Sequence, residues 1–317
     1  MLRLLDPVYD TQMPRLSTIE GLQVREDIVF TDAKGRDSTG ARKRSDKQLT
    51  FLREPLQRLL GPEEAILCVF RCNSPISDLE RFTGGWLVQK LTTATLVLTN
   101  QRLLHFPTDA KGRWKRSAGA IAWSSIAEAK VKGFLQRSIT LRYGNRKIEK
   151  FWNVEWKGAG KVKRLLPLLA GGLAAAEGER VHVCPDCYKP LTNGQYSCSS
   201  CGLLFKDEQT LWKRTLFIPG GGFFYCNQIL GGILHALGES YLLLDIAILT
   251  FAFILALLGK TKELDPVAAL TAFAFVSVFF VIEKAIVLQH CRRMIREFIP
   301  LKRTGLDQSQ FATGTPR

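Results

Sequence analysis

Two pairs of cysteines give the chain its clearest chemical motif. Cys184 and Cys187 form one Cys-x-x-Cys pair, and Cys198 and Cys201 form a second pair after ten intervening residues. Four thiolates in two tight turns suit the tetrahedral coordination of Zn²⁺, at about 2.3 Å from each sulfur. Because four protein ligands leave no open position on the ion, the spacing predicts a structural Zn²⁺ site. A redox dithiol or a disulfide pair is the alternative interpretation.

The elements that must present these cysteines fit a short module over residues 180–206. Asn193-Gly194 favours a hairpin turn between the two pairs, and Gly202 suits the left-handed backbone that such a cysteine turn often requires. The segment resembles the zinc ribbon, which implies that metal binding supplies the folding energy of the module. His182 is interpreted as a bystander. Only two lysines lie nearby, so we expect this module to contact a protein partner rather than nucleic acid.

Positive charge is concentrated in two stretches of the chain. The 317 residues include 44 Lys and Arg against 29 Asp and Glu, a net charge of +15. Residues 101–164 hold 16 basic and 4 acidic residues, a net charge of +12, and residues 284–303 hold 6 and 1, a net charge of +5. This concentration predicts that the first stretch binds anionic lipid headgroups. The expected contact residues are Arg102, Lys111, Arg113, Trp114, Lys115 and Arg116. A solvated loop is the alternative.

Alternating apolar residues predict antiparallel strands over much of residues 65–172. The pattern covers 66–72, 96–106, 138–142 and 146–151, and residues 158–169 predict a short amphipathic helix. Cys68 and Cys72 share one strand face and are interpreted as buried thiols. Strands followed by one helix indicate an α+β fold, in the form of a small barrel capped at one end.

A short motif in this region connects it to a known family. Thr99, Asn100 and Arg102 match the Leu-Thr-Asn-x-Arg motif of the bacterial pleckstrin-homology-like (PH-like), GRAM-like domain, which residues 65–172 resemble. The resemblance implies a seven-stranded antiparallel barrel with a C-terminal helix, and it implies no particular ligand. Residues 1–64 lie outside it and are predicted to form an N-terminal extension, with a mobile loop over 31–46 and a helix over 47–60.

The C-terminal third predicts a membrane anchor. Residues 241–259 and 266–282 are apolar and, with their flanks, reach the roughly 20 residues that a spanning helix needs. We therefore expect a transmembrane hairpin over 239–290, with a short connection at 260–265 and a basic cytoplasmic tail over 291–317. Lys and Arg flank the hairpin on its terminal side, so the positive-inside rule places both termini in the cytoplasm, at the inner membrane.

A glycine-rich segment precedes the hairpin. Residues 213–238 are predicted to be interfacial or re-entrant, and a third span is the alternative. Pro219–Tyr225 and the stretch around Asp245 weakly resemble the two-transmembrane domain family, with its Gly-rich Phe-Tyr motif and intramembrane Asp. Asp245 is an intramembrane polar residue, for which a structural role is expected; it is placed to pair with Lys284 or to lie at headgroup depth.

No combination of residues in the chain predicts catalysis. The sequence has no P-loop, HExxH motif or nucleophile elbow, and its four histidines lie in different modules. We therefore interpret the chain as a membrane-anchored, non-enzymatic binding or scaffold protein. The alternatives are a nucleic-acid-binding regulator at the membrane, for which the sequence gives less support, and a small transporter or channel subunit that uses Asp245.

Overall fold

The computed structural model describes residues 16–32, 34–134, 136–170, 178–258 and 265–301. The chain forms two compact units, Met1–Leu203 and Leu204–Arg317. The cysteine pairs belong to the first unit, and the apolar helices belong to the second.

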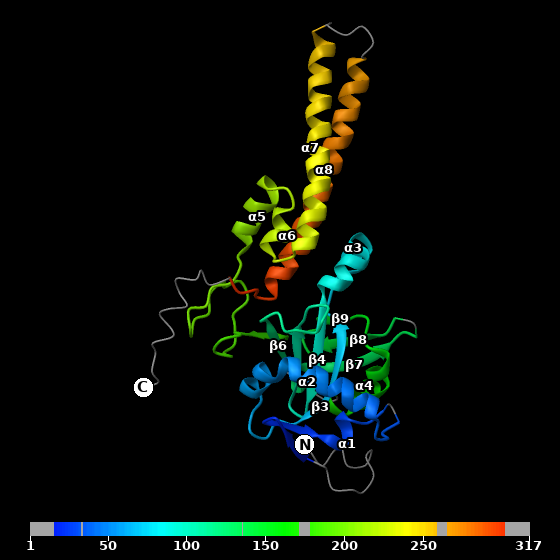
Figure 1. Cartoon of the computed structure of the whole chain (residues 1–317), viewed down its shortest axis with the longest axis vertical. Coiled ribbons are helices and arrows are strands. Elements are labelled where there is room, and N and C mark those ends of the chain that lie inside the picture. The colour runs from blue at the N-terminus through cyan, green and yellow to red at the C-terminus, as the bar shows by residue number, and fades with distance from the viewer. Residues whose placement is uncertain (1–15, 33, 135, 171–177, 259–264, 302–317) are drawn as a thin grey trace. The chain divides into compact units, whose positions relative to one another are not determined.

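Two mainly antiparallel β-sheets and their covering helices make up unit 1 (Figure 1). In the part of the chain that is described, the larger sheet has the strand order β1-β2-β3-β4-β5-β6-β10, in which only β2 and β3 are parallel; the smaller has the order β7-β8-β9. The strands are β1 (Leu16–Ile19), β2 (Leu22–Arg25), β3 (Ile66–Asn73), β4 (Thr93–Thr99), β5 (Arg102–Pro107), β6 (Ala118–Ala122), β7 (Ile126–Lys132), β8 (Ser138–Tyr143), β9 (Ile148–Phe151) and β10 (Val181–Val183). The helices of unit 1 are α1 (Glu26–Val29), α2 (Thr39–Leu59), α3 (Asp78–Leu91) and α4 (Trp156–Leu169).

The larger sheet separates two apolar cores. On one side, Phe70 and Cys72 of β3 join residues of the smaller sheet and of α4. On the other side, Val69 packs with α2. Buried residues line β3 on both faces, because each face is covered. Cys68 and Cys72 are buried free thiols, as predicted.

The predicted barrel is not closed. Strands β3 to β9 are the seven strands expected before the helix α4, but they divide into two sheets after β6, where a 3₁₀ turn at Trp123–Ser125 redirects the chain. The coarser prediction of an α+β unit is confirmed. Helix α3, between β3 and β4, was not predicted from the sequence; its backbone is kinked at Gly85.

The N-terminal extension is more ordered than its composition suggested. The predicted mobile loop over 31–46 is too long, because α2 already begins at Thr39, where the Ser38 side chain accepts a hydrogen bond from the Ala41 N–H. The helix continues through Pro55 and covers one face of the larger sheet. Residues 1–15 lie outside the described part of the chain.

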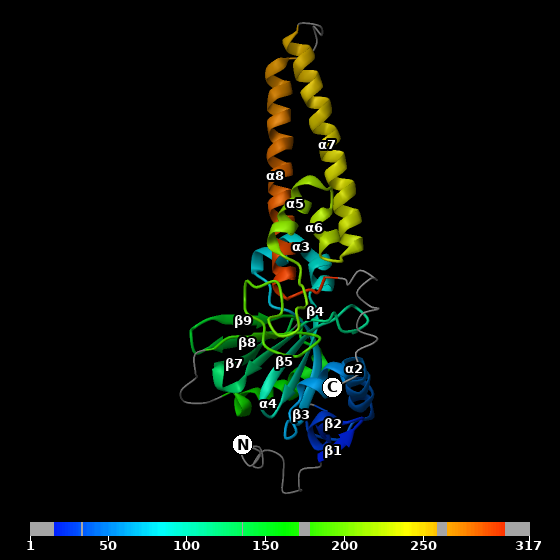
Figure 2. The same cartoon turned by 90° about the vertical axis from the view of Figure 1, so that its left-hand side faces the viewer.

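Unit 2 is helical, and two of its helices are long (Figure 2). Its helices are α5 (Glu208–Phe217), α6 (Gly221–Tyr225), α7 (Ile229–Leu257) and α8 (Pro266–Arg296). Helices α7 and α8 are long and apolar enough to cross a membrane and lie side by side as a hairpin, which suggests membrane association. Helix α8 begins at a cap, where the Asp265 carboxylate accepts from the Val267 N–H. The rest of the predicted connection, 260–264, lies outside the described residues.

The long helices of unit 2 extend beyond the limits predicted for the hairpin. The first long helix begins at Ile229 and not near 239, so the last ten residues of the predicted interfacial or re-entrant segment 213–238 belong to α7. Gly231 and Gly232 do not break this helix, because Phe223 and Phe224 of α6 pack against them; a Cβ on Gly232 would lie 2.4 Å from the Phe224 ring. The second long helix reaches Arg296, so the start of the predicted tail 291–317 is helical.

Candidate metal centre and basic loop

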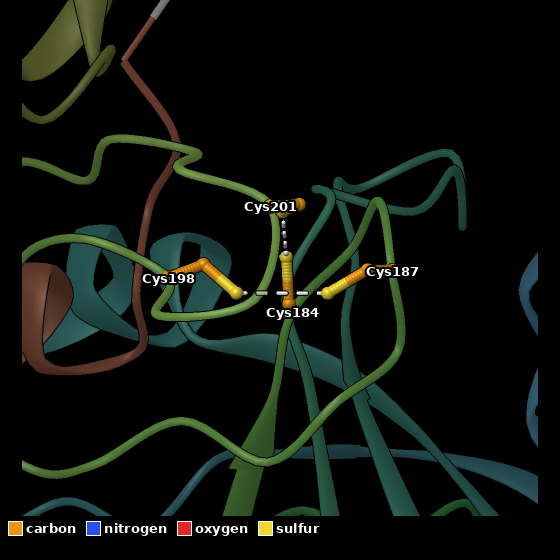
Figure 3. A group of neighbouring side chains, drawn as sticks. All are labelled: Cys184, Cys187, Cys198 and Cys201. Carbon is orange, nitrogen blue, oxygen red and sulfur yellow. Dashed lines mark hydrogen bonds between the residues drawn. The ribbon is translucent and has the colours of Figure 1, made fainter.

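The four predicted metal ligands converge. Cys184, Cys187, Cys198 and Cys201 place their sulfur atoms within 4.8 Å of one another, and Figure 3 shows them pointing toward a common centre. The Sγ–Sγ distance is 3.5 Å for Cys184 and Cys201 and 3.5 Å for Cys187 and Cys198. Sulfurs bound at about 2.3 Å in a tetrahedron lie about 3.8 Å apart. The spacing of the thiols therefore fits a four-coordinate metal ion.

The two cysteine turns have the same backbone design. In the first, the Tyr188 N–H donates to the Cys184 carbonyl at 3.0 Å; in the second, the Gly202 N–H donates to the Cys198 carbonyl at 2.9 Å. Both donors have left-handed backbones, with φ of 60° at Tyr188 and 71° at Gly202. The position that follows each pair thus carries the conformation expected at Gly202.

The surroundings of the sulfurs differ. Burial raises the pKa of the Cys184 thiol. Burial also acts on Cys198, but the N–H groups of Cys201 and Ser200 outweigh it and lower the pKa of that thiol to about 7. Since thiolates are the form that binds metal, the second turn offers the more readily ionised sulfur. Every ligand in the cluster is a cysteine, and His182 is not part of it.

The basic loop between β5 and β6 is organised around an acid. The Asp109 carboxylate accepts hydrogen bonds from the N–H groups of Lys111 and Arg113 and from the Arg113 guanidinium. Burial opposes its ionisation, but these bonds outweigh the effect and lower the Asp109 pKa. Lys111 and Arg113 are exposed at the tip of the loop.

The remaining residues of the loop make contacts within unit 1. Trp114 is half-buried, donates from Nε1 to the Ser117 carbonyl and packs its ring against Phe106. Lys115 donates to the Leu91 carbonyl. Arg116 forms an ion pair with Asp186, in the first cysteine turn. Lys111 and Arg113 are therefore the predicted lipid-contact residues of this loop whose side chains are exposed and, among the described residues, make no hydrogen bond or ion pair outside the loop.

Arg102 lies in a turn that joins two segments of unit 1. Its guanidinium forms a bidentate pair with Glu64, at 2.9 and 2.8 Å, and Glu64 is 1% exposed. In the same turn the Asn100 side chain accepts from the Ala65 N–H and donates to the Glu63 carbonyl. Thr99 also donates to Glu64. The Thr-Asn-x-Arg motif thus holds the β4–β5 turn against residues 63–65.

An aromatic surface that the sequence did not predict lies elsewhere on unit 1. We define it by four exposed rings: Phe82 and Trp86 of α3, at 87% and 58% exposure, and Phe134 and Trp156, at 77% and 62%. Phe134 and Trp156 meet edge to face. Arg81 donates to Gln136, which connects α3 to the loop that carries Phe134.

Basic groups stack on rings in and beside this aromatic surface. Lys90 lies 4.7 Å from the ring centre of Trp86, and Arg137 lies 4.5 Å from that of Trp156. Arg81 and Lys150 both stack on Trp152, which lies next to β9. Lys90 and Trp86, and likewise Lys150 and Trp152, are close in sequence, whereas Arg81 reaches Trp152 only through the fold.

Asp245 and Lys284 do not pair. Lys284 donates to the Glu239 carboxylate at 2.7 Å and to the Thr215 carbonyl at 2.6 Å. Within the described part of the chain, the half-buried Asp245 makes no hydrogen bond or ion pair. Glu239, at 1% exposure, was not singled out from the sequence, although it and His235 stand four residues apart on one helix.

Searches of family models, curated proteins and solved structures find no match to this chain.

Proposed function

We propose that this chain is a membrane-anchored, non-enzymatic binding or scaffold protein. In this proposal α7 and α8 span the inner membrane, with both termini in the cytoplasm by the positive-inside rule. Unit 1 is a PH-like domain that contacts the anionic membrane surface. The cysteine cluster holds a structural Zn²⁺, and its module provides a docking surface for a protein partner.

The PH-like assignment is supported by the order of the elements. Seven consecutive strands, β3 to β9, precede α4, and the Thr-Asn-x-Arg motif lies at the β4–β5 turn. The assignment to zinc is supported by the donor set, because four thiolates select Zn²⁺ over harder ions such as Mg²⁺ or Ca²⁺.

The aromatic surface is the observation that carries the proposed lipid contact. Exposed Trp and Phe rings are costly in water, whereas Trp is favoured at the depth of lipid headgroups. The stacked basic residues add attraction to an anionic leaflet, at about 1 kcal/mol for each residue near the surface. Lys111 and Arg113 add further positive charge on unit 1.

Hydrogen exchange in lipid nanodiscs tests this contact with the full chain. We expect residues 78–91 to be protected in anionic nanodiscs relative to neutral nanodiscs and detergent. Phe82→Ala with Trp86→Ala should lower the surface-bound population at least about tenfold, because burying one large aromatic contributes about 1.5–3 kcal/mol. Ile148→Ala, an exposed apolar residue on β9, is the matched control and should leave the protection unchanged. Equal exchange in all three environments would rule out the contact.

A nucleic-acid ligand is the second candidate, because stacked arginines and exposed rings also suit single-stranded bases. Adding an oligonucleotide to the detergent-solubilised chain separates the two. Protection of residues 78–91 by the oligonucleotide, with none from anionic lipid, would favour the nucleic-acid-binding regulator. The opposite result supports the lipid contact.

A further inference from the structure

Unit 2 contains a second group of metal-ligating side chains, remote in sequence from the cysteines. His235 and Glu239 lie one turn apart on α7, and Glu283 lies on α8. Residues four apart on a helix share one face, so both α7 side chains are directed toward the same neighbour. One ligand atom from each of the three residues lies within 4.8 Å of the others. We propose that this His235–Glu239–Glu283 cluster binds one divalent transition-metal ion.

Unsatisfied carboxylate oxygens point to a missing cation. Glu239 Oε1 and Glu283 Oε2 are both out of contact with solvent and, among the residues that the structure describes, have no hydrogen-bond donor. Glu239 is 1% exposed, and buried carboxylate oxygens without a donor are rare in folded proteins. A bound ion supplies the partner that both oxygens lack.

The charge of the cluster points the same way. Two carboxylates and the Lys284 ammonium leave one negative charge when His235 is neutral. That charge lies in helices whose other residues are mostly apolar, where an uncompensated charge is costly. One imidazole nitrogen and two carboxylate oxygens suit Mn²⁺, Fe²⁺, Co²⁺ or Zn²⁺.

Neighbouring groups hold the donors in place. Glu239 Oε2 accepts from Lys284 Nζ at 2.7 Å and from the Gly220 N–H at 2.8 Å, which fixes the carboxylate and leaves Oε1 for a ligand. His235 Nδ1 lies 2.6 Å from Glu283 Oε1, and its ring stacks on Phe223 at 4.6 Å. Lys284, Gly220 and Phe223 are not ligands themselves, and contacts of this kind orient the ligands in known metal sites. Lys284 also repels a cation, so it lowers the affinity of the site.

Mn²⁺ is the probe that separates this site from the cysteines, because thiolates bind it poorly. The full chain, purified in detergent with its cysteines loaded with Zn²⁺, is titrated with Mn²⁺ while free Mn²⁺ is followed by electron paramagnetic resonance. We expect one Mn²⁺ per chain. Glu283→Gln should weaken binding at least about tenfold, whereas Asp245→Asn, which changes another acid of α7, should have no effect.

Lys284→Gln gives a result that a purely structural role would not. It keeps a hydrogen-bond donor for Glu239 and removes the repulsion, so the Mn²⁺ affinity should rise on the order of tenfold. Circular dichroism establishes that each variant is folded, and His235→Gln replaces Glu283→Gln if the latter is not. No Mn²⁺ binding by the wild-type chain would overturn the proposal, and so would equal losses in Glu283→Gln and Asp245→Asn.

Discussion

The cysteine cluster and the His235–Glu239–Glu283 cluster are assembled in opposite ways. The cysteines come from two turns within an 18-residue span, counted from Cys184 to Cys201, and the backbone of each turn places its own ligands. In the second cluster, His235 contacts Glu283 from 48 positions away, and only the pairing of α7 with α8 unites them. A locally built site depends on its metal for its shape, whereas a site between packed helices depends on the packing.

The largest expected effect comes from removing a cysteine ligand. Cys198→Ser should lose the metal and open the segment 181–203 to proteases, because the metal supplies folding free energy on the order of 10 kcal/mol in isolated modules of this kind. Metal analysis and limited proteolysis with mass spectrometry measure both effects.

A second buried thiol is the control for this experiment. Cys68→Ala removes a thiol from the core beneath β3 and should leave the metal content unchanged. Full metal content in Cys198→Ser would contradict the local origin of the site.

An intermediate effect is expected from the ion pair that supports the second cluster. Glu239→Gln leaves the Lys284 ammonium buried without its counter-charge and should lower the free energy of unfolding by about 3 kcal/mol. Asp245→Asn, on the same helix, should change it by less than about 0.5 kcal/mol. Thermal unfolding of the purified chain in detergent tests this difference. Equal losses of stability in the two variants would contradict the stabilising role assigned to the Glu239–Lys284 ion pair.

The smallest effect is expected from the packing of α6 against α7, beside the His235–Glu239–Glu283 cluster. Gly232→Ala would place a Cβ 2.4 Å from the Phe224 ring and should cost about 1–3 kcal/mol, because α6 must shift. Gly238→Ala, on the same helix with no atom within 4 Å of the new Cβ, should be neutral or slightly stabilising. The same unfolding measurement compares them. A neutral Gly232→Ala would mean that α6 does not hold the cluster in place.

Features governed by local spacing were predictable from the sequence. The cysteine turns, the buried face of β3 and the C-terminal helix α4 all follow from patterns within a few residues. The alternation over 96–106 also gave β4 and β5, although the break at the Asn100 turn separates them into two strands.

Features governed by distant contacts were not predictable. Whether seven strands close into a barrel depends on pairing between β strands far apart in sequence, and here the chain divides into two sheets after β6. Glycines at 231 and 232 normally indicate a break, yet they continue a helix because Phe223 and Phe224 fill the space beside them. No sequence pattern around Glu283 indicates that it contacts His235, which lies 48 positions away.

Strand β10 connects the cysteine module to the edge of the larger sheet of unit 1. Its three residues pair with β6, and Cys184 follows β10 directly. Without β10, the outer N–H and C=O groups of β6 would form an open edge, the kind of surface on which other chains add strands and aggregate. The first cysteine turn directly follows the strand that covers this edge. An intact cysteine module should therefore also protect unit 1 from aggregation through β6.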